Sequence, residues 1–123
     1  MVLNTVLDTN AILYLLGGKL AKPLPSAQYF VSVISEMELL SYPSLDELSL
    51  TKIRAFLDDV VIIGLTEEIR ELAIRLRRLH TLKLPDAIVG ATALSIRAVL
   101  ITNDEKLLRV PGLSCQRVEL KHS

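Results

Sequence analysis

The sequence predicts an α/β fold, with a mainly parallel central sheet of four to five strands flanked by helices. Two observations indicate this fold. Short apolar runs rich in β-branched residues alternate with longer stretches in which apolar residues recur at helical spacing. In addition, acidic residues follow several of the short runs, where the carboxyl ends of parallel strands would share one edge of the sheet. We therefore expect a single domain over residues 1–123, with its functional groups at that edge.

The first half of the chain is predicted to contain two strands and three helices. The residues before Asp8 form an apolar run typical of a strand. The run after Asn10 is apolar nearly all round, as in a buried helix that Gly17 and Gly18 end. Two prolines then predict a loop. The predicted strands lie at residues 3–7 and 29–33, and the loop at residues 19–26. The predicted helices lie at residues 10–16, 35–42 and 45–58.

The second half is predicted to continue the alternation. A continuous apolar run after Asp59 is typical of a strand that helices cover on both faces. The next helix, capped by Thr66, has an apolar face and an arginine-rich face, and a helix begun by Pro85 carries small residues that allow close packing. The predicted strands lie at residues 60–65, 98–102 and 116–120. The predicted helices lie at residues 67–80, 85–96 and 104–109.

Composition limits the class of protein. Half of the 123 residues are apolar, which is sufficient for one core. The formal net charge of zero provides no overall basic field, so a polyanion must be met by a local patch. Cys115 has no partner for a disulfide, no export signal follows Met1, and charged residues interrupt every long apolar run. We expect a cytoplasmic protein that does not enter the membrane.

Four acidic residues near the ends of apolar runs are the main functional signal. They are Asp8, Glu38, Asp86 and Asp104. Carboxylates gathered in a dry cleft raise one another's pKa unless a cation lies among them. A hard divalent ion such as Mg²⁺ or Mn²⁺ is the cation that oxygen ligands of this kind bind. The pattern therefore predicts metal-assisted chemistry.

Each acid also has a structural interpretation. The three aspartates stand at predicted helix starts, where a carboxylate accepts hydrogen bonds from free backbone N–H groups and meets the positive end of the helix dipole. Ser35 and Glu38 have the spacing of a capping box, in which Glu38 would bond the backbone of Ser35. Capping explains each acid separately, but it does not explain the sequence that surrounds all four.

The segments around these acids occur in the order and context of one family. They read Leu7-Asp8-Thr9-Asn10, Ser32-Val33-Ile34-Ser35-Glu36-Met37-Glu38-Leu39-Leu40, Pro85-Asp86-Ala87-Ile88-Val89-Gly90-Ala91-Thr92-Ala93 and Ile101-Thr102-Asn103-Asp104. Together they resemble PIN-domain ribonucleases, and in particular VapC-type toxins of toxin-antitoxin pairs. The resemblance extends over nearly the whole chain, and the first and third segments are its most specific parts.

The resemblance implies a catalytic metal site for RNA hydrolysis. Asp8, Glu38, Asp86 and Asp104 would hold Mg²⁺ or Mn²⁺, which in the family positions a water for in-line attack on an RNA phosphodiester. No serine, cysteine or histidine nucleophile is then required. The polar residues Thr9, Asn10 and Thr102 match family positions that orient carboxylates or bound water.

Two further expectations follow from the resemblance. Glu38 is chosen over Glu36 because its Glu-Leu-Leu context matches the family, while Glu36 remains an alternative. The implied partners are RNA, an antitoxin whose segment lies across the first helices, and a second copy of the chain in a homodimer.

Other polar residues suggest secondary roles. The densest basic cluster runs from Arg70 to Lys83, and within it Arg75, Arg78 and Lys83 are candidates for contact with RNA phosphates. His80 and His122 are candidates for acid or base catalysis. A helix end and a terminal tail explain their positions equally well.

Two other functions compete with the nuclease as explanations of the sequence. A phosphoacceptor receiver domain also places acids around Mg²⁺ at strand ends, but it needs two adjacent acids after the first strand and a lysine after a later one. The chain has only Asp8 and Asn103 at those places. The other alternative is a non-catalytic module that binds RNA or protein on a PIN-like fold.

Overall fold

The computed structural model describes residues 3–122, and its center is a five-stranded sheet. All neighbouring strands are parallel, in the order β3-β2-β1-β4-β5. The α/β class and the mainly parallel sheet expected from the sequence are confirmed. The strands are β1 (Asn4–Leu7), β2 (Gln28–Ser32), β3 (Val61–Ile63), β4 (Val99–Ile101) and β5 (Cys115–Gln116).

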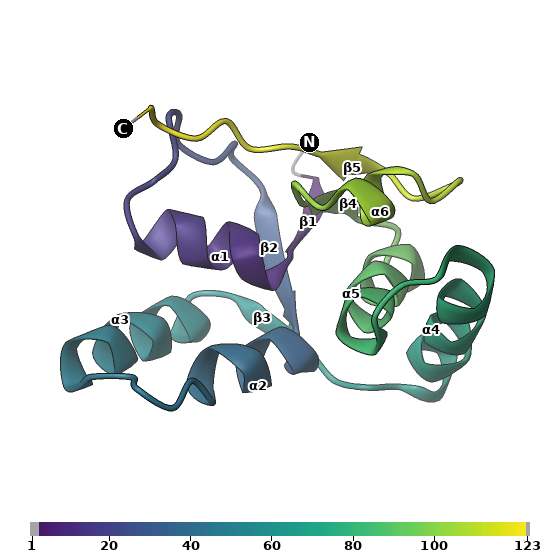
Figure 1. Ribbon diagram of the computed structural model, residues 1–123, viewed down its shortest axis with the longest axis horizontal. Helices are drawn as coiled ribbons and strands as arrows, with labels where there is room; N and C mark the ends of the chain where they lie inside the picture. The colour runs from purple at the N-terminus through teal and green to yellow at the C-terminus, as the bar shows by residue number, and fades with distance from the viewer. Residues whose placement is uncertain (1–2, 123) are drawn as a thin grey trace.

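Helices cover both faces of the sheet. Figure 1 shows α1 and α3 on one side of the strands, with α4 and α5 on the other. Within residues 3–122, no helix combines the length and apolar character needed to cross a membrane. The helices are α1 (Thr9–Leu16), α2 (Val33–Leu40), α3 (Glu47–Asp58), α4 (Glu67–His80), α5 (Leu84–Ser95) and α6 (Glu105–Leu108).

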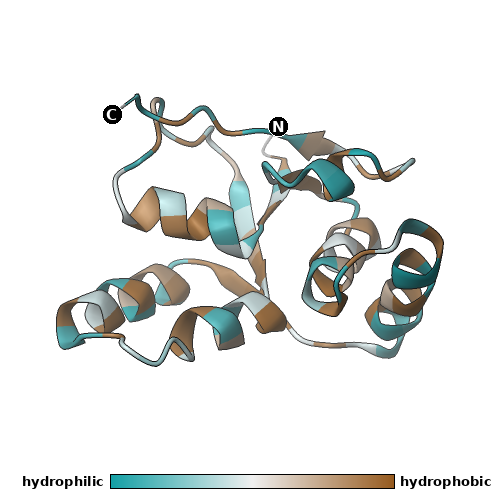
Figure 2. Cartoon of the chain, viewed as in Figure 1, coloured by the Kyte–Doolittle hydropathy of each residue, from teal (hydrophilic) through white to brown (hydrophobic). Residues whose placement is uncertain are grey.

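Each face of the sheet has its own hydrophobic cluster, because successive strand residues point to opposite faces. Val6 and Leu100 pack with α4, α5 and α6, while Leu7 and Ile101 pack with α1, α2 and α3. Figure 2 shows hydrophobic residues on the strands and hydrophilic residues on parts of α4. Fully burying a side chain of this kind contributes about 2 kcal/mol, so these pairs fix the sheet between its helices.

Close packing between α4 and α5 depends on a glycine. A Cβ added at Gly90 would lie 3.3 Å from a methyl group of Leu107 and 3.4 Å from one of Leu76. The small residues predicted to let this helix pack closely therefore have a structural role. They hold α5, with its first turn, against α4 and α6.

Polar caps fix where most helices begin. The side chains of the residues before α1, α2, α3, α4 and α6 each accept a backbone hydrogen bond from the first turn. The exception is α5, which follows Lys83 without a side-chain cap and has Pro85 in its first turn. These five caps are Asp8, Ser32, Asp46, Thr66 and Asp104.

Three sequence predictions were wrong in detail. Ser32 caps α2, so the helix begins at Val33 and not at residue 35; Ser35 lies inside it, and the capping box with Glu38 does not form. The strand predicted at residues 60–65 is only β3, an edge strand paired on one side, and Val61 is exposed. The last strand ends at residue 116, because the following segment leaves the sheet.

That following segment, residues 117–121, is here called the C-terminal strap. The side-chain amide of Asn103 donates to the Val118 carbonyl over 3.1 Å, and its oxygen accepts from the Val118 N–H over 2.9 Å. The rest of the strap pairs with the loop after α1 through the contacts Ala21–Glu119, Lys19–Lys121, Leu20–Leu120 and Lys22–Glu119. The strap thus joins the end of β4 to the end of α1.

Candidate functional site

The carboxyl edge of the sheet gathers the four acids singled out from the sequence. Asp8 follows β1, Asp104 lies three residues beyond β4, Glu38 lies on α2, and Asp86 lies in the first turn of α5. The negative charges of the other three act on the carboxyl group of Asp86, and those of Asp104 and Glu38 act on Asp8. The four acids therefore form one electrostatic cluster, called the acidic cluster below.

Asp8 is the most buried member. Its side chain is 7% exposed and caps α1 by accepting a hydrogen bond from the Ala11 N–H over 2.8 Å. Burial raises the pKa of Asp8, and the charges of Asp104 and Glu38 raise it further. The hydrogen bonds from Thr102 and Ala11 lower this pKa but do not offset the burial.

Asp86 differs from a capping residue. The residue at the cap position is Lys83, and no hydrogen bond to the Asp86 side chain occurs within residues 3–122. Burial is the largest cause that raises the pKa of Asp86, followed by the charges of Asp104, Asp8 and Glu38. Lys83 alone acts in the opposite direction. Capping therefore does not explain Asp86, which lies in the first turn of α5 but is not its cap.

Glu38 is held by the helix that follows the first strand. Thr9 Oγ1 lies 2.7 Å from Glu38 Oε1 and 2.9 Å from Ser35 Oγ. Because a hydroxyl has one hydrogen, a Thr9 that donates to the carboxylate can accept from Ser35. Sequence reasoning assigned Ser35 to a cap and missed this contact, although Ser35 and Glu38 are spaced to share a helix face.

Asp104 is held by hydrogen bonds of both its backbone and its side chain. Its N–H donates to Thr102 Oγ1 over 3.0 Å, and its carboxylate accepts from the Lys106 N–H over 2.8 Å as the cap of α6. The fully buried Thr102 side chain also hydrogen-bonds Asp8. Thr102 thus connects the first and the last acid of the cluster.

The remaining candidates are less involved. Glu38, and not Glu36, is the glutamate whose charge acts on Asp8 and Asp86. Asn10 is exposed and makes no side-chain hydrogen bond within residues 3–122. The structure also adds Lys83, the basic residue whose charge acts on Asp86.

The acidic cluster has the donor chemistry of a metal site without the closed geometry of one. Within residues 3–122, no three histidine, cysteine, aspartate or glutamate side chains are arranged to hold a metal ion together. The ion pairs of that part of the chain join Lys22 to Glu119 and Arg117 to Glu105, and so leave the cluster unneutralised. Its hard oxygen donors and mutual repulsion fit a divalent cation, provided that the side chains move closer together.

Comparison with known families now adds to this geometry. Residues 5–113 match the PIN domain. The chain belongs to the PIN-domain family. PIN domains are generally nucleases that use divalent metals, which agrees with oxygen ligands at the carboxyl edge of a parallel sheet. None of the curated proteins matches the sequence significantly.

Several solved structures resemble this PIN domain over nearly its full length. A chain of a toxin-antitoxin complex from Klebsiella pneumoniae is 31% identical with a TM-score of 0.74, and the match covers 89% of this chain and 94% of that chain. A chain of VapBC-1 from nontypeable Haemophilus influenzae is 25% identical with a TM-score of 0.75, and the match covers 93% of this chain and 97% of that chain. A chain of VapBC2 from Rickettsia felis, bound to a promoter DNA fragment, is 20% identical with a TM-score of 0.79, and the match covers 94% of this chain and 99% of that chain. These matches confirm the resemblance to VapC-type PIN domains.

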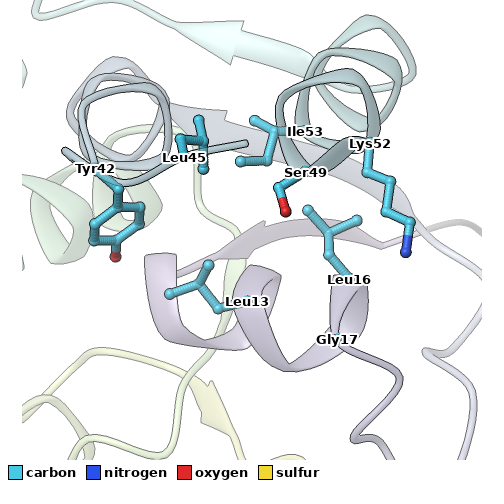
Figure 3. Close-up of a pocket in the computed structure, with 8 residues that line it drawn as sticks. All are labelled: Leu13, Leu16, Gly17, Tyr42, Leu45, Ser49, Lys52 and Ile53. Atoms are coloured by element: carbon cyan, nitrogen blue, oxygen red, sulfur yellow. The ribbon is translucent and has the colours of Figure 1, made fainter. Parts of the chain in front are cut away.

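An apolar groove lies apart from the acidic cluster. Figure 3 shows it between α1 and the segment from the end of α2 through α3, with a volume of about 320 Å³. Tyr42 at its rim is 43% exposed, so the groove is open to solvent. It is lined by Leu13, Leu16, Gly17, Tyr42, Leu45, Ser49, Lys52 and Ile53.

The predicted RNA-contact residues lie along and just after α4. Arg75 and Arg78 line a shallow cavity with Leu79 on that helix. Lys83 immediately precedes α5 and is the only one of the three whose charge acts on the acidic cluster. His80 is the last residue of α4, and His122 lies in the exposed end of the chain.

Proposed function

We propose that this PIN domain is a Mg²⁺- or Mn²⁺-dependent endoribonuclease and the toxin component of a toxin-antitoxin pair, acting in the cytoplasm as a single domain. The observation that carries the proposal is the acidic cluster, in which burial, and then the charges of neighbouring acids, raise the pKa of Asp8 and of Asp86. Membership of a nuclease family and the likeness to chains of toxin-antitoxin complexes support the same function.

Asp8, Glu38, Asp86 and Asp104 are the residues proposed to hold the ion. A bound divalent ion would polarise phosphoryl oxygens and lower the pKa of a water molecule. The chain's own contribution is to place the ligands. Capping of α1 fixes Asp8, the Thr9 hydroxyl fixes Glu38, and Thr102 fixes Asp8 relative to the backbone of Asp104.

The decisive experiment is cleavage of a mixed RNA pool by the purified chain with Mg²⁺ or Mn²⁺, beside an EDTA control. We expect cuts that require metal and that disappear in Asp86→Asn. The matched control is Asp46→Asn, because Asp46 is also an aspartate at the start of a helix, and its carboxylate accepts from the Ser49 N–H over 2.7 Å. This variant should cleave as the wild type does.

The same experiment separates the alternative function. A folded protein that binds the RNA pool but cuts none of it with either metal would contradict the nuclease proposal and favour a non-catalytic binding module. Cleavage that survives in EDTA, or equally in Asp86→Asn, would contradict the role proposed for the metal and the cluster.

The apolar groove supports an antitoxin partner. The solved relatives include complexes of toxins with antitoxins, and an open groove of Leu13, Leu16 and Tyr42 suits the apolar face of a partner segment. We expect Leu16→Glu to weaken co-purification with an antitoxin partner, without reducing RNA cleavage by the isolated toxin. Unchanged binding would exclude this groove.

A homodimer is proposed from exposed apolar side chains on α4 and at the start of α5. Ile74 and Leu79 on α4 and Leu84 at the start of α5 are 44%, 73% and 51% exposed, so a second copy of the chain would find apolar side chains to cover there. We expect light scattering to give the mass of a dimer for the wild type and that of a monomer for Leu79→Glu. A wild-type monomer at all accessible concentrations would contradict the dimer.

A further inference from the structure

A cavity lies between the end of α4 and α6, lined by one imidazole and two cationic side chains. Its volume is about 250 Å³, and its lining residues are His80, Lys106 and Arg109. Lys106 and Arg109 are three positions apart, on and just after α6, so their side chains can share a face. Both are exposed and His80 is half-buried, so a ligand in solution can reach all three.

The polar groups of these side chains are not used inside the described part of the protein. Within residues 3–122, none of the three side chains takes part in a hydrogen bond or an ion pair. The nearest acid in sequence, Glu105, is bound by Arg117 over 2.6 Å, and Arg109 is only the weakest influence on its pKa. The cavity thus presents uncompensated positive charge.

Chain topology places this cavity next to the acidic cluster. The short connection after His80 leads directly to Asp86, and α6 is capped by Asp104. Arg109 lies five positions after Asp104, which corresponds to about 8 Å along a helix at ~1.5 Å per residue. A distance of about 8 Å is on the order of the separation between neighbouring phosphates along one nucleic-acid strand.

We propose that the His80, Lys106 and Arg109 cavity binds a backbone phosphate of the RNA substrate, about one nucleotide from the bond that is cut. The proposal rests on the nuclease function proposed above. Arginine and lysine supply charged donors for phosphate oxygens, and the imidazole of His80 supplies a further N–H. Such contacts position a strand and do not read its bases, so the cavity sets register without selecting sequence.

The test measures binding of a labelled, short single-stranded RNA of mixed sequence by fluorescence anisotropy over a range of salt, in EDTA so that metal-dependent cleavage does not interfere. Lys106→Gln and Arg109→Gln are compared singly and together with the wild type. The matched control is Arg54→Gln, an exposed arginine on α3 far along the fold from α6. Thermal unfolding of each variant checks that the fold is retained.

We expect Kd to rise about threefold to tenfold for each removed charge, as for one charge-assisted contact at an exposed site. The slope of log K against log salt should become shallower by about 0.7 for each lost contact. With Mn²⁺ added, the variants should raise KM, cut the same sites and keep kcat within about twofold, because the lost contact is made equally in the ground and transition states. Arg54→Gln should change neither Kd nor the slope by comparable amounts.

Different results separate the failure of this inference from that of the nuclease proposal. If the wild type cuts RNA but Lys106→Gln and Arg109→Gln bind it unchanged, the cavity is not a phosphate site and the nuclease proposal stands. An equal loss in Arg54→Gln would show that only the net charge matters, which also overturns the inference. A wild type that neither binds nor cuts RNA contradicts both.

Discussion

Asp8 and Asp46 have the same local role and opposite electrostatics. Each caps a helix, with a hydrogen bond of 2.8 Å to the Ala11 N–H and of 2.7 Å to the Ser49 N–H respectively. The pKa of Asp46 is lowered, because the hydrogen bonds from Ser49 favour the charged form in solvent. The pKa of Asp8 is raised, because it is buried beside other acids.

The difference shows what capping explains and what it does not. A helix start by itself stabilises a carboxylate, as Asp46 demonstrates. At Asp8 the same stabilisation is outweighed by burial and by Asp104 and Glu38, an arrangement that lowers the stability of the metal-free fold. Acids held together at such a cost are characteristic of functional sites. Residues of the acidic cluster, and the hydroxyl that holds one of them, can therefore be compared with matched residues of α3 and its cap.

The largest expected difference is in catalysis. Asp8→Asn keeps a capping oxygen but removes a charge from the proposed metal site, so RNA cleavage should fall by about 100-fold or more, beyond the loss typical of a residue outside the ligand set. Asp46→Asn should retain full activity. Rates with Mn²⁺ on one RNA substrate provide the measurement, and similar rates for the two variants would remove the distinction between the aspartates.

Metal binding should separate the same two variants in stability. Mn²⁺ at about 100 times its dissociation constant would stabilise the folded wild type by about 2.7 kcal/mol, since the ion binds only the folded protein. Calorimetry should show the increased melting temperature in the wild type and in Asp46→Asn, but not in Asp8→Asn. A wild-type melting temperature that does not respond to the metal would contradict the proposed site.

A smaller effect is expected from the hydroxyl group that holds Glu38. Thr9→Val removes the 2.7 Å contact to the carboxylate with little change of shape, and activity should fall about tenfold, as for other residues that orient metal ligands. The control is Thr51→Val, whose hydroxyl donates over 2.9 Å to the Glu47 carbonyl inside α3. If both variants lose activity to the same extent, Thr9 has no specific role.

The smallest expected effects are in the pH dependence of stability. In the unfolded chain the carboxyl pKa is near 3.8, and in the folded protein the pKa values of Asp8 and Asp86 are higher. Between these values the folded protein binds more protons, so without metal its free energy of unfolding falls as pH rises through the folded pKa. The lowered pKa of Asp46 has the opposite sign: its contribution is present above 3.8 and is lost as pH falls through the folded pKa.

Urea denaturation in EDTA at a series of pH values measures both slopes. Asp86→Asn should weaken the loss of stability on the neutral side and leave the acidic side unchanged. Asp46→Asn should do the reverse. A wild type whose free energy of unfolding rises steadily from acid to neutral pH would contradict the destabilisation expected from the acidic cluster.

The alternating pattern and the residues after the apolar runs were enough to predict the fold class and to place Asp8 and Asp104 at strand ends. Both predictions depend on patterns that neighbouring residues carry, namely the hydrophobic periodicity and the order of strands and helices along the chain. The predicted length of β3 was wrong, because an apolar run does not reveal that its strand lies at the edge of a sheet. The contacts of Ser35 with Thr9 and of Asn103 with Val118 join residues distant in sequence, so no local pattern could predict them.

The reciprocal hydrogen bonds between Asn103 and Val118 also set the order in which the protein opens. Beyond residue 116 the C-terminal strap is held by this side chain and by a few contacts to the loop after α1, not by a strand ladder. Segments held by few exposed hydrogen bonds open without global unfolding. In hydrogen exchange, the amides of Val118, Ala21 and Lys121 should therefore lose protection together and early, while the amides of β1 and β4 persist until the whole sheet separates.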